Sequence, residues 1–211
     1  MSAADAPHRG LLIDFGGVLT SNVFAAFAAF AAAEGLEPEA VAESFRRDRE
    51  ARQLLKDLES GAIDTAAFAG PFAAKLGLAP DRADGLVGRM FAALRADEAM
   101  VGAVRRAKAA GVRTALVSNS WGDGMRYDEE LLRDGFDAVV LSHELRIRKP
   151  DPGMFLAATE RLGLPPETCV FVDDLPFNLE PAAALGMATV LHRDAATTLP
   201  RLETLLGVAL R

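Results

Sequence analysis

The sequence predicts an α/β protein in which a doubly wound parallel sheet carries an inserted all-helical segment. Short apolar runs alternate with helical patterns from residue 97 onward, and the runs end in polar residues or glycine. Repeating strand–helix units of this kind form a parallel sheet with right-handed crossovers. A further apolar run at 11–13 is followed by a stretch from about 22 to 94 that has helical patterning and no convincing strand. We therefore expect the helical stretch to interrupt the sheet after its first strand.

The first predicted strand, at 11–13, ends in a carboxylate. An uninterrupted apolar run of this length suits a strand that is buried on both faces of a parallel sheet. Asp14 follows it, and Gly16 and Gly17 then allow a sharp turn. Ligands of open α/β sheets bind outside the carboxyl ends of the strands. Asp14 is therefore placed for chemistry, although an Asp at this position can also simply cap the next helix.

Four helices are expected in the inserted stretch. The first ends near Gly35, the second runs from Pro38 to a break at Gly61, the third starts from Asp64 as N-cap, and the fourth runs from Asp81 to Leu94. Phenylalanine recurs along these helices. Such a series is more typical of the core of a helical bundle than of a ligand site.

The remaining elements alternate regularly. We expect a helix at 97–110, a strand at 112–117, a helix around 125–134, a strand at 137–141, a helix at 152–162, a strand at 169–172, a helix at 176–185, a strand at 187–191 and a closing helix. This order assigns residues 1–20 and 95–211 to an α/β core domain. Residues 21–94 form a helical domain of their own.

Bulk properties restrict the partners. The chain has 211 residues, is half hydrophobic and carries a net charge of −7, which predicts a soluble globular protein that binds neither nucleic acid nor an anionic membrane. The single Cys169 excludes an internal disulfide and fits a reducing compartment. Residues 1–9 lack a secretory pattern, and no run reaches the roughly 18 apolar residues of a membrane span. The expected location is cytoplasmic, and the oligomeric state is left open.

Polar groups gather at one edge of the predicted sheet. The strand ends deliver Asp14, Ser118, Asn119, Asp173 and Asp174, and Lys149 lies between the last two strand ends in the sequence. Converging carboxylates repel one another unless a cation intervenes, and oxygen ligands suit Mg²⁺. A metal beside Asp14 would keep it ionised as a nucleophile, while Ser118, nearby main-chain N–H groups and Lys149 would hold phosphoryl oxygens. The pattern predicts phosphoryl transfer.

Four segments together resemble the motifs of the haloacid dehalogenase (HAD) superfamily. They are Leu-Leu-Ile-Asp-Phe-Gly-Gly-Val-Leu-Thr, Ala-Leu-Val-Ser-Asn-Ser-Trp, Arg-Lys-Pro-Asp-Pro, and Val-Phe-Val-Asp-Asp-Leu-Pro-Phe-Asn-Leu followed by Ala-Leu-Gly-Met. The resemblance covers about residues 10–207 and is greatest to the group that includes the N-terminal phosphatase domain of soluble epoxide hydrolase. It implies a HAD-like Rossmannoid core with a helical cap that closes over the cleft and selects the substrate.

The resemblance also implies a role for each site residue. Asp14 would form an aspartyl-phosphate on a small phosphorylated metabolite, and Lys149 would neutralise charge. Ser118, Asn119 and Gly17 would bind the substrate. The implied cofactor is Mg²⁺, with Asp14, the carbonyl of Gly16 and Asp174 as ligands and Asp173 as a ligand or a neighbour.

One position departs from the family pattern. Most phosphatases of the superfamily have a second Asp two residues after the nucleophile, which protonates the leaving group, and here that residue is Gly16. A positioned acid typically contributes about 10²–10⁴ in rate. The proton could instead come from the cap, the substrate or water. The alternative is a catalytically weak or inactive HAD-fold protein that binds or regulates.

Two other enzyme classes fit the sequence less well. Ser120, Asp173 and His192 follow the α/β-hydrolase order, and Ser120 lies in a turn that resembles a nucleophile elbow, but this reading gives Asp14 and Lys149 no role. Hydrolytic dehalogenation is disfavoured because the paired acids at 173 and 174 would repel a carboxylate substrate.

Overall fold

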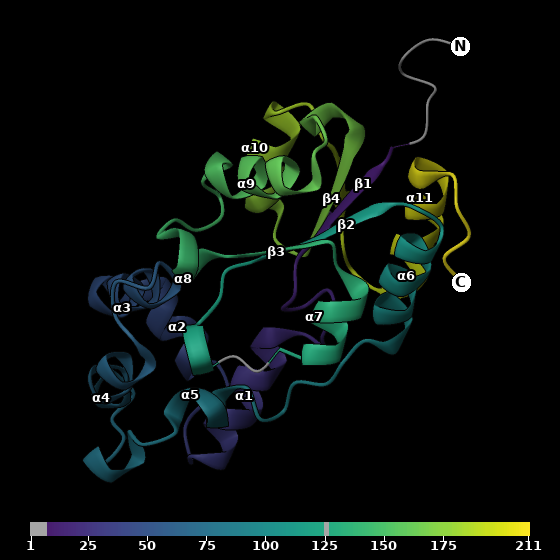
Figure 1. Ribbon diagram of the computed structural model, residues 1–211. Helices are drawn as coiled ribbons and strands as arrows, with labels where there is room; N and C mark the ends of the chain where they lie inside the picture. The colour runs from purple at the N-terminus through teal and green to yellow at the C-terminus, as the bar shows by residue number, and fades with distance from the viewer. Residues whose placement is uncertain (1–7, 125–126) are drawn as a thin grey trace.

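A five-stranded parallel sheet forms the centre of the protein (Figure 1). The computed structural model describes residues 8–124 and 127–211. The strands are β1 (Gly10–Ile13), β2 (Arg113–Ser118), β3 (Ala138–Leu141), β4 (Cys169–Asp173) and β5 (Ala188–Leu191), in the order β3-β2-β1-β4-β5. The predicted α/β class with a parallel sheet is confirmed.

The strand register aligns the ends of β1, β2 and β4. Ile13 pairs with Leu116 of β2 and with Val172 of β4, and the N–H of Asp14 continues the ladder with a 3.0 Å hydrogen bond to the carbonyl of Val172. Asp14 and Asp173 each follow the last paired residue of β1 and β4, Ile13 and Val172, and so lie at the same level. The carboxyl ends of the central strands meet at one edge, as expected of a parallel sheet.

Helices cover both faces of the sheet, which explains why its strands are mostly apolar. Helices α9 (Pro152–Leu162) and α10 (Pro176–Ala184) pack on one face, and α6 (Glu98–Ala109) and α11 (Ala195–Leu206) pack on the other (Figure 1). Leu12 belongs to the core cluster under α9, whereas Leu11 and Ile13 belong to the opposite cluster. Helix α7 (Glu129–Gly135) packs against α6; the predicted helix around 125–134 is thus shorter, and residues 125–126 lie outside the described part.

The inserted helices gather beyond the carboxyl edge of the sheet (Figure 1). They are α1 (Val23–Ala33), α2 (Ala40–Arg47), α3 (Arg49–Glu59), α4 (Thr65–Lys75) and α5 (Leu86–Met90), with a 3₁₀ turn at Pro80–Arg82. Asp64 caps α4 as expected, because its side chain accepts a hydrogen bond from the N–H of Ala67. Within the described ranges, no helix is both long and apolar enough to cross a membrane.

Three details of the helix prediction were wrong. The expected second helix is divided at Asp48, whose carboxylate accepts the N–H groups of Glu50 and Ala51 and so starts α3 as a new helix. The expected helix from 81 to 94 shrinks to the turn and α5, because Gly85 adopts a positive φ of 62°. The short helix α8 (Ser142–Leu145) was not expected.

The phenylalanines of the insertion form a core around Trp121, which follows β2. The ring centroids of Phe27, Phe68 and Phe91 lie 5.9, 5.6 and 4.9 Å from that of Trp121. Phe72 is also fully buried. The expectation that the phenylalanines are core residues holds for Phe68 and Phe72, whereas Phe24 is exposed. Trp121 joins this core to the sheet.

The two connections between the insertion and the sheet run side by side. Ser21 donates from its N–H to the carbonyl of Arg95 at 2.7 Å, and the N–H of Asp97 donates to the carbonyl of Leu19 at 2.9 Å. A β-bridge joins Thr20 and Ala96. These contacts fit a boundary near residues 20 and 95, and the division into core and cap domains stays a prediction.

Candidate active site

Asp14 is buried at the carboxyl end of β1. Its Oδ1 accepts hydrogen bonds from the N–H of Phe15 at 2.7 Å and from Nζ of Lys149 at 2.8 Å. Burial raises the pKa of Asp14 from 3.8 to about 7; the charge of Lys149 opposes the rise, and the carboxylate of Asp173 adds to it. An acid in this position is held firmly, and it needs further positive charge to stay ionised.

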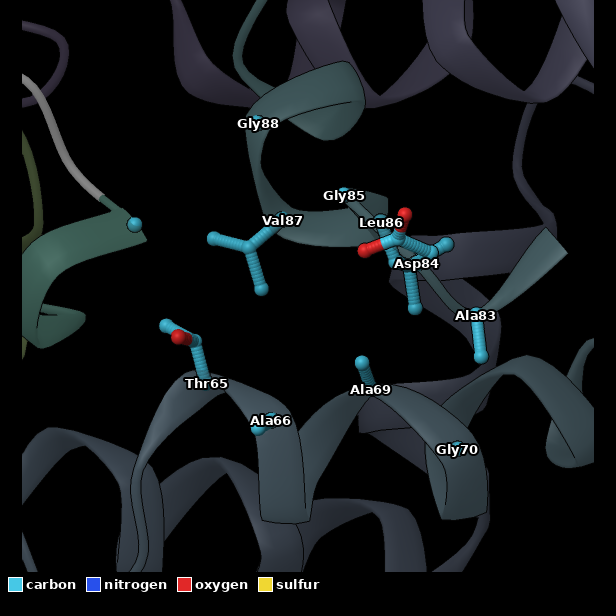
Figure 2. A pocket seen from close by; sticks show the side chains of 11 residues that line it. Thr65, Ala66, Ala69, Gly70, Ala83, Asp84, Gly85, Leu86, Val87 and Gly88 are labelled. Carbon is cyan, nitrogen blue, oxygen red and sulfur yellow. The ribbon is translucent and has the colours of Figure 1, made fainter.

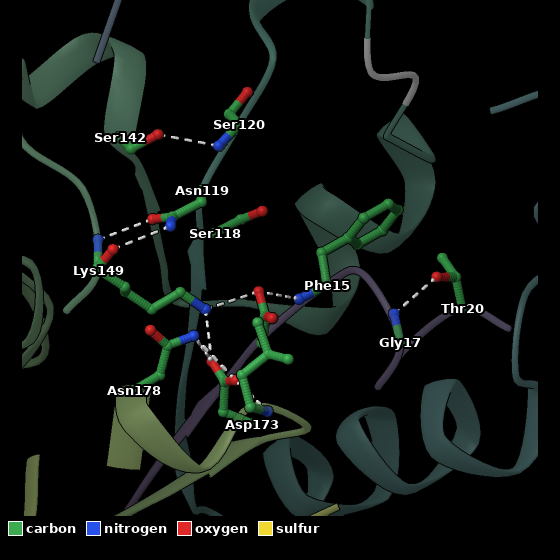
Figure 3. A network of polar contacts seen from close by, with 12 residues as sticks. Phe15, Gly17, Thr20, Ser118, Asn119, Ser120, Ser142, Lys149, Asp173 and Asn178 are labelled. Carbon is green, nitrogen blue, oxygen red and sulfur yellow. Dashed lines mark hydrogen bonds and ion pairs between the residues drawn. The ribbon is translucent and has the colours of Figure 1, made fainter. Parts of the chain in front are cut away.

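Lys149 bridges two carboxylates. Its Nζ lies 2.8 Å from Oδ1 of Asp14 and 2.7 Å from Oδ2 of Asp173, and its side chain is 1% exposed (Figure 3). Burial lowers the pKa of Lys149, but the two carboxylates outweigh it and raise the pKa to about 12. The lysine therefore remains a permanent cation in the site.

Asn119 fixes the main chain of Lys149. The N–H of Lys149 donates to Oδ1 of Asn119 at 2.8 Å, and Nδ2 of Asn119 donates to the carbonyl of Lys149 at 3.1 Å (Figure 3). Both ends of the amide are thus used to position the lysine. Asn119 lies at the sheet edge where the sequence predicted it, and its side chain binds the main chain of Lys149.

The two neighbouring acids at the end of β4, Asp173 and Asp174, have different surroundings. Both oxygens of Asp173 accept from Nδ2 of Asn178, and they also take hydrogen bonds from Lys149 and from the N–H of Leu175. Asp174 is only partly buried, and its pKa is raised to about 6, chiefly by burial and then by the charge of Asp173. Sequence reasoning assigned no role to Asn178, which locks Asp173 in place.

Gly17 must be glycine because of Asp174. The backbone of Gly17 has a φ of 80°, and an added Cβ would lie 2.6 Å from Oδ2 of Asp174. Its N–H donates to Oγ1 of Thr20 at 3.1 Å (Figure 3). The turn after β1 therefore brings main chain directly beside the acid.

Three carboxylates are close enough to share a metal ion. Oxygen atoms of Asp14, Asp173 and Asp174 all lie within 4.8 Å of one another. Oxygen ligands are the preferred ligands of Mg²⁺, and a divalent cation would offset the negative charge that Lys149 alone leaves uncompensated. The residues present therefore fit Mg²⁺.

Ser118 is held by Tyr127, and no sequence pattern predicted this contact. The hydroxyl of Tyr127 donates to Oγ of Ser118 at 3.0 Å, and the Tyr127 ring lies 4.5 Å from that of Phe15. Burial raises the pKa of Tyr127 to about 12, so it stays protonated. Because Oγ of Ser118 receives this hydrogen bond, the serine can donate its own proton elsewhere.

A cavity of about 270 Å³ lies between the sheet edge and the inserted helices, in front of Asp14. Its polar lining includes Ser118, Asn119, Lys149, Asp174 and the pair Glu59–Arg148. Six aromatic residues also line it: Phe24, Phe27, Phe45, Phe91, Trp121 and Phe177. A cavity with a few convergent polar groups in an apolar wall is typical of a small-molecule site.

A larger cavity of about 500 Å³ lies within the insertion, between α4 and the segment around α5 (Figure 2). Its lining consists mainly of small side chains such as Ala66, Ala69 and Gly70, with Asp84 at one side. Asp14, Asp174 and Lys149 line the smaller cavity. The chemistry is therefore assigned there.

Gly16 leaves limited room beside the acid. It lines the smaller cavity, and an added Cβ would lie 2.9 Å from Cγ2 of Val23 on α1. Val23 thus occupies part of the space that a side chain at position 16 would need.

The residues of the alternative triad are not joined to one another. Asp173 binds Lys149 and Asn178, while Nδ1 of His192 contacts Oγ1 of Thr198 at 2.9 Å. Ser120 is fully buried, and its N–H donates to Oγ of Ser142. This arrangement does not form a serine-hydrolase relay.

Comparison with known proteins relates the chain to one family. The family model described as haloacid dehalogenase-like hydrolase matches residues 8–186. Bifunctional epoxide hydrolase 2 of Sus scrofa is 36% identical over 117 residues, which are 53% of this chain and 21% of that protein. The fructose-1-phosphate phosphatase YqaB of Escherichia coli is 41% identical over 59 residues, which are 28% of this chain and 31% of that protein. The chain thus spans less than a third of either relative.

A solved structure shares the fold. A HAD family enzyme from Bacteroides thetaiotaomicron superposes with a TM-score of 0.69 and 23% identity, over 89% of this chain and 95% of that one. The same enzyme has been solved in complex with magnesium and inorganic phosphate. The likeness supports the doubly wound core with inserted helices.

Proposed function

Because the chain belongs to the haloacid dehalogenase-like hydrolases, we propose that it is a Mg²⁺-dependent phosphatase acting on a small phosphorylated molecule. Family membership confirms the resemblance found in the sequence. The observation that carries the proposal is the 2.8 Å ion pair between Lys149 and Asp14, beside Asp173 and Asp174. It combines a candidate nucleophile, a fixed cation and a group of acids suited to a metal.

Asp14 is the proposed nucleophile. The N–H of Phe15 and Nζ of Lys149 hold its carboxylate, so little reorientation is needed before attack. One carboxylate oxygen would bond to phosphorus as the bond to the leaving group breaks, which gives an aspartyl-phosphate. Water would then add to phosphorus and release inorganic phosphate, which regenerates Asp14.

The phosphoryl oxygens would be bound by groups at the edge of the sheet. Lys149 supplies positive charge and Ser118 a hydroxyl proton that its contact with Tyr127 leaves available. Asn119, whose side chain holds Lys149, and Gly17, whose missing side chain leaves room beside Asp174, stay predicted substrate contacts.

The metal would be held by Asp14, Asp174 and the carbonyl of Gly16. Asp173 would act through its charge and through Lys149, because both of its oxygens already accept protein hydrogen bonds. When bound, Mg²⁺ supplies Lewis-acid stabilisation of the negative charge on the phosphoryl oxygens. The phosphatase relative from Escherichia coli supports this chemistry, and the inserted helices would act as its cap.

Activated phosphates test the proposal. We expect Mg²⁺-dependent release of phosphate from p-nitrophenyl phosphate or acetyl phosphate, because good leaving groups need little protonation. Activity should disappear with EDTA and in Asp14→Asn, and acid-quenched wild-type protein should yield a peptide phosphorylated on Asp14. A wild-type protein without turnover on either compound would reject the phosphatase assignment.

The second candidate is a binding or regulatory protein, and Gly16 is the observation that favours it. Such a protein would bind Mg²⁺ and inorganic phosphate in titration calorimetry without hydrolysing either activated phosphate. The same pair of measurements therefore separates the two functions.

A further inference from the structure

A second ion pair, with one buried partner, lines the cavity on the side of the inserted helices. Glu59 is the last residue of α3, its side chain is 9% exposed, and its Oε2 contacts Nε of Arg148. Arg148 directly precedes Lys149, and Glu59, Arg148 and Lys149 all line the cavity in front of Asp14. A carboxyl of the inserted helices thus lines the same cavity as the proposed nucleophile.

The end of α3 is anchored to the core, which fixes this carboxyl. The carbonyl of Glu59 accepts a hydrogen bond from Oγ of Ser142, which in turn accepts one from the N–H of Ser120 at 2.9 Å (Figure 3). Gly61 follows in a positive-φ turn that lies against the main chain of His143: an added Cβ would be 2.5 Å from the His143 carbonyl. Glu59 therefore has a defined position relative to the sheet edge.

Glu59 is also the acid of the cavity to which no role has yet been assigned. Among the described residues that line the cavity, the acids are Asp14, Asp174 and Glu59. The first is the proposed nucleophile and the second a proposed metal ligand. Burial raises the pKa of Glu59, although Arg148 opposes the rise. A proton donor works best when its pKa is near the working pH.

We propose that Glu59 is the general acid of this enzyme and takes the place of the aspartate that is absent at Gly16. The inference rests on the proposed phosphatase function. As Asp14 bonds to phosphorus and the P–O bond to the leaving group breaks, the Glu59 proton passes to the leaving oxygen and gives a neutral alcohol. In the second step Glu59 takes a proton from the attacking water, and phosphate leaves Asp14.

Arg148 is a positioning residue in this scheme. It holds the carboxyl toward the cavity, and its charge keeps the pKa of Glu59 from rising as far as burial alone would take it. Such a carboxyl can release its proton to a poor leaving group and recover it from water within one turnover.

The test compares two probes of similar shape that differ in their need for an acid. Phenyl phosphate has a poor leaving group and 2,4-dinitrophenyl phosphate a good one. With enzyme in excess and saturating Mg²⁺, Glu59→Gln should lower the single-turnover release of phenol by about 100-fold or more, while release of dinitrophenolate stays within about threefold of wild type. Glu50→Gln, an exposed substitution on the same helix, should change neither rate.

Two further readouts separate catalysis from folding. In wild type, phenol release should fall as pH rises through the ionisation of Glu59, and this decline should be lost in Glu59→Gln. Glu59→Asp keeps a carboxyl group on a side chain that is shorter by one methylene. It should therefore also slow the release of phenol more than the release of dinitrophenolate. It replaces Glu59→Gln if that variant does not fold.

Each outcome decides a different question. Equal losses on both probes would overturn the proposal and make Glu59 a structural contact between α3 and the core. Unchanged rates on both would also overturn it. If wild type releases neither phenol nor dinitrophenolate in the presence of Mg²⁺, the phosphatase function itself fails, and the role of Glu59 fails with it.

Discussion

Gly17 and Asp174 are so close that the glycine determines where the acid can lie: a Cβ at position 17 would be 2.6 Å from Oδ2 of Asp174. The same glycine has a φ of 80°, a backbone conformation that residues with a Cβ adopt only at a cost in free energy. The turn after β1 and the proposed metal ligand after β4 are therefore built as one unit, and a change on one strand end should be measurable on the other.

Gly17→Ala should weaken Mg²⁺ binding as well as stability. The positive φ alone should reduce the free energy of unfolding by about 1–2 kcal/mol, and the contact with Asp174 should displace that carboxylate. Gly35→Ala is the matched control, since Gly35 has a φ of 74° with nothing within 4 Å of an added Cβ. Titration calorimetry and urea unfolding of both variants check the prediction, and equal Mg²⁺ affinity in wild type and Gly17→Ala would contradict it.

Lys149→Met should destabilise the protein strongly. The change leaves the buried carboxylates of Asp14 and Asp173 without their shared cation, and the loss of one partner of a buried ion pair typically costs about 3–5 kcal/mol. Lys75→Met removes a lysine that pairs with Asp48 and Glu50 on the surface of the insertion, and it should cost much less, because solvent screens exposed ion pairs. Urea unfolding at neutral pH measures both; similar losses would mean that the bridge contributes little.

The Mg²⁺-free protein should lose stability as pH rises from about 4 toward 7. Burial raises the pKa of Asp14 from 3.8 to about 7, so the native state keeps a proton in this range that the unfolded chain has released. The pKa of Asp174, raised to about 6, acts in the same direction. Urea unfolding in EDTA across this range should show the decline.

Two controls accompany this pH series. Asp14→Asn should reduce the slope, because the side chain no longer titrates. Saturating Mg²⁺ should reverse the decline toward neutral pH, since the metal binds the deprotonated carboxylates. Stability that rises with pH in EDTA would show that Lys149 alone compensates the cluster.

Local sequence signals were sufficient for the sheet and for its functional edge. Apolar runs set the strands, and parallel pairing then aligns Asp14 with Asp173 without any knowledge of the side-chain contacts. The division of the second helix at Asp48 was missed because helical apolar spacing continues on both sides of this cap, at Phe45 and Leu54. A capping signal is weak beside a long periodic pattern.

Contacts between the insertion and the core could not be read from the sequence. Glu59 reaches the cavity because Ser142 anchors the end of α3, and Tyr127 reaches Ser118 across the sheet edge. No local sequence pattern predicts either contact. Ser142 and Glu59 are distant in sequence, and Tyr127 lies outside any helix or strand. The sequence identified the missing acid at Gly16, and tertiary packing was needed to identify a replacement.

Restoring an acid at position 16 should rescue the loss of Glu59. Gly16→Asp places a carboxyl two residues after the nucleophile, but its Cβ would lie 2.9 Å from Cγ2 of Val23, so Val23→Ala is introduced with it. In the wild-type background the gain on phenyl phosphate should be small, because Glu59 already donates the proton. In the Glu59→Gln background the same pair of changes should raise the rate on phenyl phosphate by about 10-fold or more.

The rescue has its own control and its own contrary result. Val23→Ala alone should leave the ratio of the phenyl phosphate rate to the dinitrophenyl phosphate rate unchanged, since it adds no acid. A large gain from Gly16→Asp in the wild-type background, equal to the gain in Glu59→Gln, would mean that no acid operates in the native site. Gains that depend on the absence of Glu59 would instead place the two carboxyls in the same step, because two donors that serve one leaving group are not additive.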